Sequence, residues 1–183
     1  MAAAREHMFD EEPLPEAVVL DSDFVIHVLH ENEEFHGECI AFARRLLDNN
    51  VPIIYSSLLR IDFWSGWRRA VNLRGLPPEI AEAPLLLPDP VAERARLYRV
   101  GDGYLRDFLR LFERYEVRIG VRLLNRALPV MAHYNLRSHD ACVVACALHT
   151  EVPHIASLDR DFCRVDGIEL WNNDIPSRRR RTG

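Results

Sequence analysis

The sequence predicts an α/β fold with a mostly parallel central sheet flanked by helices, and two observations support this prediction. Short apolar runs typical of buried strands alternate with longer segments whose apolar residues recur at helical spacing. Aspartates follow the apolar runs or open the helical segments in four separate parts of the chain. Because α/β folds gather functional side chains at strand ends and helix starts, this arrangement also predicts a functional site.

The first half of the chain supplies strands and helices in alternation. These segments are, in chain order, a flexible lead-in over 1–16, a strand over 17–21, a helix from Ser22 to about His30, a helix over 35–48, a strand over 51–55 and a helix from Ser57 to about Val71. Ser22 and Ser57 are candidate caps because a serine hydroxyl accepts hydrogen bonds from free N–H groups of the first turn. Phe35, Cys39 and Phe42 recur at the spacing of one helical face.

The second half begins with a segment that differs in composition from the rest. Five prolines between 75 and 90 disfavour regular structure there. The segments that follow are a helix from Val91 to Tyr115 that Gly101 and Gly103 could interrupt, a short strand or connection over 117–119, a helix around 123–131 that Pro129 should bend or split, a helix over 138–149, and strands over 154–157 and 168–171. We expect one domain over 17–174, with a Pro-rich and helical insertion over about 75–115 and a basic tail over 175–183.

Length and composition are those of an ordinary globular protein. With 183 residues, 48% hydrophobic and 28% charged, the chain can bury a substantial core. No apolar run approaches the roughly 20 residues of a membrane span, and the N-terminus lacks the layout of a secretory signal. We therefore expect a cytoplasmic protein that does not contact a membrane. The four cysteines lack the spacing of a zinc site and are too few for a disulfide framework.

The charged residues narrow the chemistry. The net charge of −5 gives no overall attraction to nucleic acid, and every one of the 23 basic side chains is arginine. The absence of lysine excludes Schiff-base chemistry and a phosphate-binding Walker loop, because both require that side chain.

The aspartates point to a metal site. Asp21 ends the first strand, Asp62 lies on the helix after the second strand, Asp140 opens a later helix, and Asp159 and Asp161 follow the strand at 154–157. Each acid alone could cap a helix, form a turn or pair with an arginine. Carboxylates that converge repel one another, and a hard cation such as Mg²⁺ or Mn²⁺ relieves that repulsion. Their joint placement therefore predicts a divalent-cation site.

Four stretches, in this order along the chain, resemble the PIN-domain nucleases and, among them, the VapC-like toxins. They are Val-Val-Leu-Asp-Ser-Asp at 18–23, Ser-Ser-Leu-Leu-Arg-Ile-Asp at 56–62, residues 136–148 around Ser-His-Asp-Ala, and Ala-Ser-Leu-Asp-Arg-Asp-Phe at 156–162. The resemblance covers residues 17 to about 171. It implies a three-layer α/β/α fold and a metal-dependent endoribonuclease, specifically the toxin of a VapBC-type toxin–antitoxin system. It also implies Mg²⁺ or Mn²⁺ as cofactor, RNA as substrate, a small cognate antitoxin as partner, and a homodimer.

The same resemblance assigns roles to particular residues. The implied metal ligands and catalytic residues are Asp21, Asp62, Asp140 and Asp159, with Asp161 as an auxiliary acid and Ser22 and Ser157 as hydroxyls near the metal. In the family the second acid is usually glutamate, so the shorter Asp62 would reach the metal through water. Asp23 adds a negative charge where the family has a small polar residue. The stretch from Gly75 to Tyr115 is longer than a compact toxin needs.

Contacts to RNA are predicted from side-chain chemistry. Arg68, Arg69 and Arg137 are candidates for holding the RNA backbone, although each also fits a plain surface role. Trp64 and Trp67 could stack on bases, although their spacing of three fits a core or interface role better.

Two other functions remain open from the sequence. Residues 19–23 also resemble the opening motif of haloacid-dehalogenase-type phosphatases, with Asp21 as nucleophile and Asp23 as acid/base, but the lysine that such enzymes usually need is missing. A non-catalytic PIN-like module that only binds RNA or a protein is the other alternative.

Overall fold

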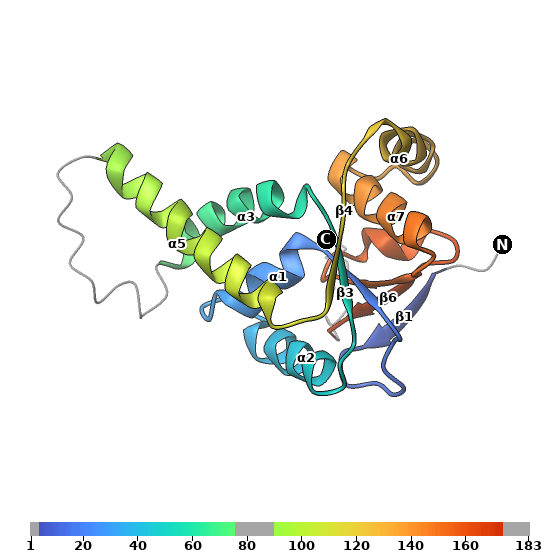
Figure 1. Cartoon of the computed structure of the whole chain (residues 1–183), viewed down its shortest axis with the longest axis horizontal. Helices are drawn as coiled ribbons and strands as arrows, with labels where there is room; N and C mark the ends of the chain where they lie inside the picture. Colours follow the sequence, from blue (N-terminus) through green and yellow to red (C-terminus); the bar gives the residue numbers. More distant parts are fainter. Residues whose placement is uncertain (1–3, 76–89, 174–183) are drawn as a thin grey trace, which may run out of the picture.

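A six-stranded sheet with all strands parallel forms the centre of the molecule (Figure 1). The computed structural model describes residues 4–75 and 90–173. The strands, in spatial order, are β1 (Arg5–Met8), β6 (Glu169–Asn172), β5 (His154–Ala156), β2 (Val18–Leu20), β3 (Ile53–Ser56) and β4 (Arg114–Val117). The predicted α/β fold with a parallel sheet is therefore confirmed.

Helices cover both faces of this sheet, which gives three layers (Figure 1). The helices are α1 (Ser22–Leu29), α2 (His36–Asp48), α3 (Leu59–Arg74), α5 (Pro90–Arg110), α6 (Val121–Tyr134), α7 (Ser138–Thr150) and the 3₁₀ helix η1 (Arg160–Arg164). Side chains alternate along a strand, so Val18 and Leu20 pack with α1, α2, α3 and α5, whereas Val19 packs with α6 and α7. None of the described helices is long and apolar enough to cross a membrane.

The expected flexible lead-in over 1–16 is wrong for its central part. Arg5–Met8 form β1, an edge strand that pairs in parallel with β6. His7 is buried, stacks on Trp171 with ring centroids 4.7 Å apart, and lies 2.9 Å from Glu169 Oε2. Only four residues long and mostly polar, this strand lacks the apolar alternation from which strands are predicted.

The predicted interruption of one helix at its glycines and the predicted splitting of another at its proline are also wrong. Helix α5 continues through Gly101 and Gly103 and ends at Arg110, and α6 continues through Pro129. A Cβ atom at residue 101 would lie 2.6 Å from Trp67 Nε1, so this glycine allows α5 to approach α3 closely. The strand expected as an option over 117–119 is β4, three residues earlier than predicted.

Two predicted segments fall on residues that the structure does not describe. The Pro-rich part of the insertion, over 76–89, lies outside the described residues, as does the basic tail over 175–183. The division of the chain into these segments stays a prediction.

Candidate active site

The connections of the sheet create a crevice between β2 and β5. From β2 the chain proceeds to β3 and β4 on one side, whereas β5 leads to β6 on the other. In open α/β sheets, ligands bind where the strand order reverses, beyond the carboxyl ends of the strands. A cavity of about 810 Å³ lies there. Its lining includes all four predicted acids, Asp21, Asp62, Asp140 and Asp159.

Asp21 follows β2 directly and caps α1. Its Oδ1 accepts a hydrogen bond from the backbone N–H of Ser22 at 2.7 Å, so Asp21, and not Ser22 as predicted, is the capping residue. Its Oδ2 accepts a hydrogen bond from the Ser157 hydroxyl at 2.8 Å. This contact joins the ends of β2 and β5, the two strands on either side of the crevice.

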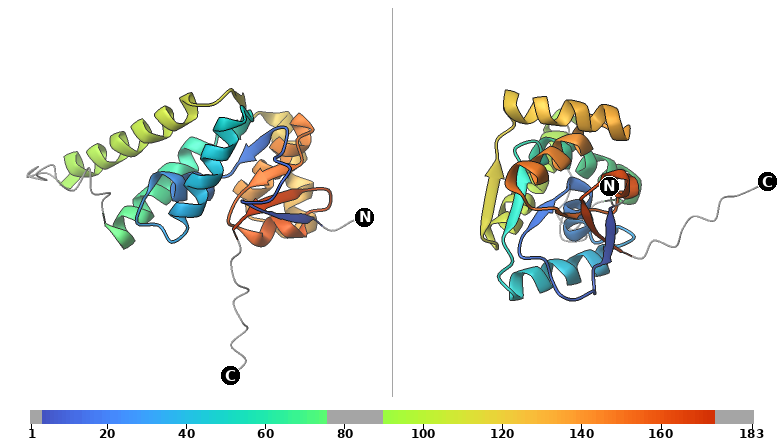
Figure 2. Two further views of the ribbon diagram at one scale, coloured as in Figure 1. Left: turned by 90° about the horizontal axis from the view of Figure 1, so that it is seen from below. Right: turned by 90° about the vertical axis from the view of Figure 1, so that its right-hand side faces the viewer.

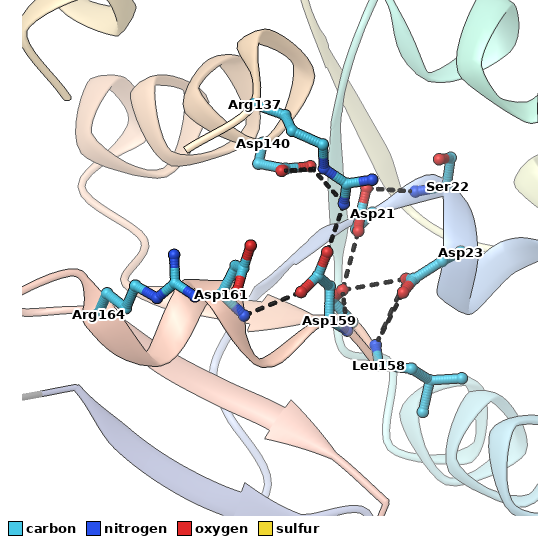
Figure 3. Close-up of polar contacts among 10 residues, drawn as sticks. Asp21, Ser22, Asp23, Arg137, Asp140, Leu158, Asp159, Asp161 and Arg164 are labelled. Carbon is cyan, nitrogen blue, oxygen red and sulfur yellow. Dashed lines mark hydrogen bonds and ion pairs between the residues drawn. The ribbon is translucent and has the colours of Figure 1, made fainter. Parts of the chain in front are cut away.

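Asp23 also belongs to this cluster (Figure 3). It accepts hydrogen bonds from Ser157 Oγ at 3.0 Å and from the Leu158 backbone N–H at 3.2 Å. Burial raises the pKa of Asp21, and burial together with the neighbouring charge of Asp21 raises the pKa of Asp23 well above its ordinary value. The single proton of the Ser157 hydroxyl cannot be donated to both acids at once. The pair therefore has a surplus of negative charge that a cation would neutralise.

Asp140 and Asp159 are held together by Arg137 (Figure 3). Arg137 precedes α7 and donates from Nε to Asp140 Oδ2 at 2.9 Å, while its Nη2 donates to Asp159 Oδ2. Burial raises the pKa of Asp140, and the hydrogen bond from Arg137 opposes that effect. The Arg137 side chain is 70% exposed, so the group that bridges these acids is accessible from solvent.

Asp161 does not line the cavity. Its backbone N–H donates to Asp159 Oδ1 at 2.9 Å, which makes Asp159 the cap of η1, and its carboxylate lies 2.7 Å from Arg164 (Figure 3). Its contact with the cavity therefore runs through the backbone of η1 and the carboxylate of Asp159.

Asp62 is brought to the cavity by the close packing of α3 on α1. One turn further along α3, a Cβ atom at Gly66 would lie 2.1 Å from Ile26 Cδ1, so the side chain of Ile26 occupies the space that the glycine leaves. Asp62 Oδ1 is buried and accepts no hydrogen bond, although His139 Nδ1 lies 2.7 Å away. Burial raises the pKa of Asp62 to about 6; the charges of Asp21 and Asp140 add to the shift, and His139 opposes it.

The donor set suits a hard divalent cation. The acids offer only oxygen ligands, they repel one another, and Asp62 Oδ1 has no hydrogen-bond donor of its own. Within residues 4–75 and 90–173, however, no three His, Cys, Asp or Glu side chains are grouped as ligands of one ion. Arg137 and His139 lie against the carboxylates instead.

The predicted RNA-contacting residues are separated by α3. Arg69 and Arg137 line the acid cavity, whereas Arg68 lies in a second groove on the other side of α3. Trp67 is buried in the core, as its spacing suggested, and cannot stack on a base. Trp64 is partly buried and donates from Nε1 to Asp102 at 3.1 Å.

Asp23 and His139 line the cavity but are not among the metal ligands predicted from the sequence. The sequence predicts Asp23 only as an extra charge and as part of the phosphatase alternative, and it predicts no role for His139. Each lies within two residues of a predicted acid at the start of a helix, and that proximity was the available signal.

Comparisons with known proteins agree with the fold. One solved structure that shares it is VapBC2 from Rickettsia felis bound to a promoter DNA fragment, with a TM-score of 0.55 and 11% identity over 86% of this chain and 99% of that one. Another is the Sarcin-Ricin loop cleaving toxin VapC20 from Mycobacterium tuberculosis, with a TM-score of 0.54 and 13% identity over 80% of this chain and 92% of that one. A third is FitAcB from Neisseria gonorrhoeae, with a TM-score of 0.52 and 12% identity over 85% of this chain and 96% of that one. No curated protein gives a significant match. The PIN domain family matches residues 18–168, most of the chain. The resemblance noted in the sequence is thus confirmed, and this chain belongs to the PIN domain family.

Proposed function

We propose that this protein is a metal-dependent endoribonuclease. The observation that supports the proposal is that four carboxylates from separate segments line one cavity at the point where the strand order reverses. A structural relative, VapC20, is a toxin that cleaves the Sarcin-Ricin loop. Membership of the PIN domain family removes the support for the phosphatase alternative, which rested on residues 19–23 alone.

Asp21, Asp62, Asp140 and Asp159 would hold Mg²⁺ or Mn²⁺. When bound, such an ion lowers the pKa of a water molecule and neutralises the charge that develops on a phosphodiester. The short Asp62 side chain lines the cavity and would contribute to holding the ion through a bridging water molecule. Ser157 keeps the carboxylate of Asp21 directed across the crevice through their 2.8 Å hydrogen bond.

Two arginines of the cavity would act on the substrate. Arg137 would release Asp140 and Asp159 and donate to an RNA phosphate, since guanidinium binds phosphate and carboxylate through the same paired geometry. Arg69, which lines the same cavity, would hold a neighbouring phosphate. His139, 2.7 Å from Asp62, would set the charge of that carboxyl group.

Cleavage of a labelled RNA in the presence of Mg²⁺ or Mn²⁺ tests the proposal. We expect Asp140→Asn to reduce the cleavage rate at least about a hundredfold, because even residues that only support metal ligands contribute 10- to 100-fold. Asp161→Asn should lose less than about tenfold, since the backbone N–H that reaches Asp159 is retained. The matched control is Asp107→Asn, an exposed acid on α5, which should cleave like the wild type. Equal cleavage by the wild type, by Asp140→Asn and in excess chelator would reject the proposal.

We also propose that the protein is a cytoplasmic toxin with a small antitoxin as partner, and that it forms a homodimer. The solved relatives include VapBC2 bound to a promoter fragment and FitAcB, which supports a toxin–antitoxin assignment. Expression of the wild-type chain alone should arrest bacterial growth, and expression of Asp140→Asn should not. Arrest by both proteins would contradict the toxin assignment, and sedimentation of the purified chain as a monomer would contradict the dimer.

A non-catalytic PIN-like module is the second candidate. The observation that favours it is that Arg137 forms ion pairs with Asp140 and Asp159, and that His139 lies 2.7 Å from Asp62. Calorimetric titration with Mn²⁺ separates the two functions. A nuclease should bind the ion and lose that binding in Asp140→Asn, whereas a module that only binds RNA or protein need not bind it.

A further inference from the structure

We propose that the groove between α3 and α5 is a second substrate site, which binds single-stranded RNA extending from the acid cavity. The groove has a volume of about 490 Å³ and is lined by residues of both helices. These are Arg60, Ile61, Trp64, Ser65, Arg68, Tyr98, Arg99 and Asp102. This proposal rests on the proposed ribonuclease function, since it assigns a route to the substrate of that same site.

The groove adjoins the acid cavity at one residue of α3, Ser65. Ser65 lines both hollows, and the side chain of Ile61 on the same surface is 54% exposed. Asp62 and Arg69 face the acid cavity, whereas Arg60, Trp64 and Arg68 face the groove. A strand that leaves the acid cavity can therefore cross α3 at Ser65 and enter the groove directly.

The two helices lie side by side and antiparallel, as the views in Figures 1 and 2 show. Arg60 near the start of α3 contacts Asp102 late in α5, and Arg68 shares a small cavity with Leu97, earlier in α5. The groove thus follows the helix pair away from the sheet. Phosphates of a strand lying along it would meet arginines from both helices.

The electrostatics of the groove are opposite to those of the acid cavity. Three arginines, Arg60, Arg68 and Arg99, line the groove with a single carboxylate, Asp102. In the described part of the chain, no carboxylate forms an ion pair with Arg68 or Arg99. Guanidinium groups without a carboxylate partner can bind phosphate oxygens, which supply most of the affinity of proteins for nucleic acids.

Arg60 is organised for base stacking. The nearly buried Asp102 accepts hydrogen bonds from Arg60 Nε at 2.5 Å and Arg60 Nη2 at 2.6 Å, and from Trp64 Nε1 at 3.1 Å. These bonds fix the Arg60 guanidinium over the Trp64 ring, 5.1 Å from its centroid. The side chain is still 54% exposed, so one guanidinium face remains open. Unpaired bases stack on such faces and on aromatic rings, a contact that bases inside a duplex cannot offer.

Binding measured without cleavage tests the groove separately from the chemistry. Fluorescence anisotropy in chelator would compare a labelled dodecanucleotide with a trinucleotide for the wild type and for Arg68→Gln/Arg99→Gln. We expect the variant to bind the dodecanucleotide about tenfold more weakly and the trinucleotide as the wild type does. Two lost phosphate contacts should also reduce the slope of log K against log salt by about 1.4. The matched control is Arg44→Gln/Arg126→Gln, two arginines on other faces, with unchanged affinity.

Stacking is tested by Arg60→Lys, which keeps the charge but loses the planar guanidinium. This variant should bind the dodecanucleotide more weakly than the wild type does. Double-stranded RNA added as a competitor should displace the labelled dodecanucleotide from the variant no better than from the wild type. Thermal unfolding of each variant, compared with that of the wild type, shows whether the helix pair remains folded.

The outcomes separate this proposal from the proposed function. Wild-type binding through the groove without cleavage in Mn²⁺ would reject the nuclease and keep the groove. Cleavage with equal dodecanucleotide affinity for wild type and Arg68→Gln/Arg99→Gln would reject the groove and keep the nuclease. Failure of the wild type to bind the dodecanucleotide would also reject the groove. So would loss of a co-purified protein partner by the variant with RNA binding unchanged, because the groove would then be a protein interface.

Discussion

The acids of the cavity illustrate how a buried carboxylate opposes stability. Asp21, Asp23, Asp62 and Asp140 all have raised pKa values, and in each the largest cause is burial. A carboxyl group whose pKa is higher in the folded protein than in the unfolded chain destabilises the fold when it is ionised. Asp62 is the clearest case, because burial raises its pKa to about 6 even though His139 opposes the shift.

Asp62→Asn should stabilise the metal-free protein at about pH 8 and have little effect at about pH 4. The folded pKa is about 6 and the ordinary value is 3.8, so the folded state binds the proton more tightly. The unfavourable effect of the ionised carboxylate is fully present above pH 6 and disappears as the pH falls toward 3.8. The full shift corresponds to about 3 kcal/mol, but Asp62 borders an open cavity, and screening by solvent should reduce the effect to about 1 kcal/mol. Thermal unfolding in chelator should therefore show a rise in Tm of about 3 °C at the higher pH, since 1 kcal/mol corresponds to about 2–4 °C for a chain of this size.

Addition of Mn²⁺ at about pH 8 should make the wild type more stable than Asp62→Asn. The wild type should gain more in Tm than Asp62→Asn, because only the wild type offers the carboxylate to the ion. A variant that is equally stabilised at both pH values would show that the raised pKa of Asp62 is not the cause.

At the scale of elements, helix α3 lies between two hollows of the surface. One side of it carries Asp62 and Arg69 into the acid cavity, and the other forms the groove with α5. A glycine lies at the close contact on each side, Gly66 against Ile26 of α1 and Gly101 against Trp67. These glycines lie within helices, where glycine has poor propensity, so close packing explains their presence better than helix formation.

Gly101→Ala and Gly103→Ala should change stability in opposite directions. A Cβ atom at residue 101 would lie 2.6 to 2.8 Å from three atoms of the Trp67 indole, whereas at residue 103 it would meet nothing within 4 Å. Both variants gain up to about 1 kcal/mol of helix propensity, but overpacking costs about 1–3 kcal/mol. Urea unfolding should therefore find Gly103→Ala more stable than the wild type and Gly101→Ala less stable. Equal stabilisation of both would contradict the close contact between α5 and Trp67.

At the scale of the whole molecule, the N-terminal segment is part of the domain. Beyond β1, Phe9 is buried and stacks on Phe42 of α2 with centroids 4.6 Å apart, and it meets Phe24 of α1 edge-on at 5.5 Å. The segment therefore joins the edge of the sheet to one helical layer. It lies far from the acid cavity in the sheet order, with β6 and β5 between β1 and β2.

Phe9→Ala should destabilise the protein by about 3–5 kcal/mol, the usual range for a buried phenylalanine. The control is Asp10→Ala, an exposed neighbour, which should stay within about 0.5 kcal/mol of the wild type. Urea unfolding followed by circular dichroism measures both. If Phe9→Ala behaved like the control, the N-terminal segment would be the flexible lead-in first expected.

The sequence alone determined the alternation of strands and helices, because apolar periodicity is a local property of the chain. It also indicated Asp21, Asp62, Asp140 and Asp159 as candidate metal ligands, since each lies beside a strand end or a helix start. The tertiary structure decided which side chains share a cavity. Asp23 and His139 line the cavity together with the predicted acids, and Arg68 and Arg69 lie on opposite sides of α3. The tertiary structure also paired the polar strand β1 with β6. These features arise from contacts between residues far apart in the chain, and a local sequence pattern does not specify which distant residues it will contact.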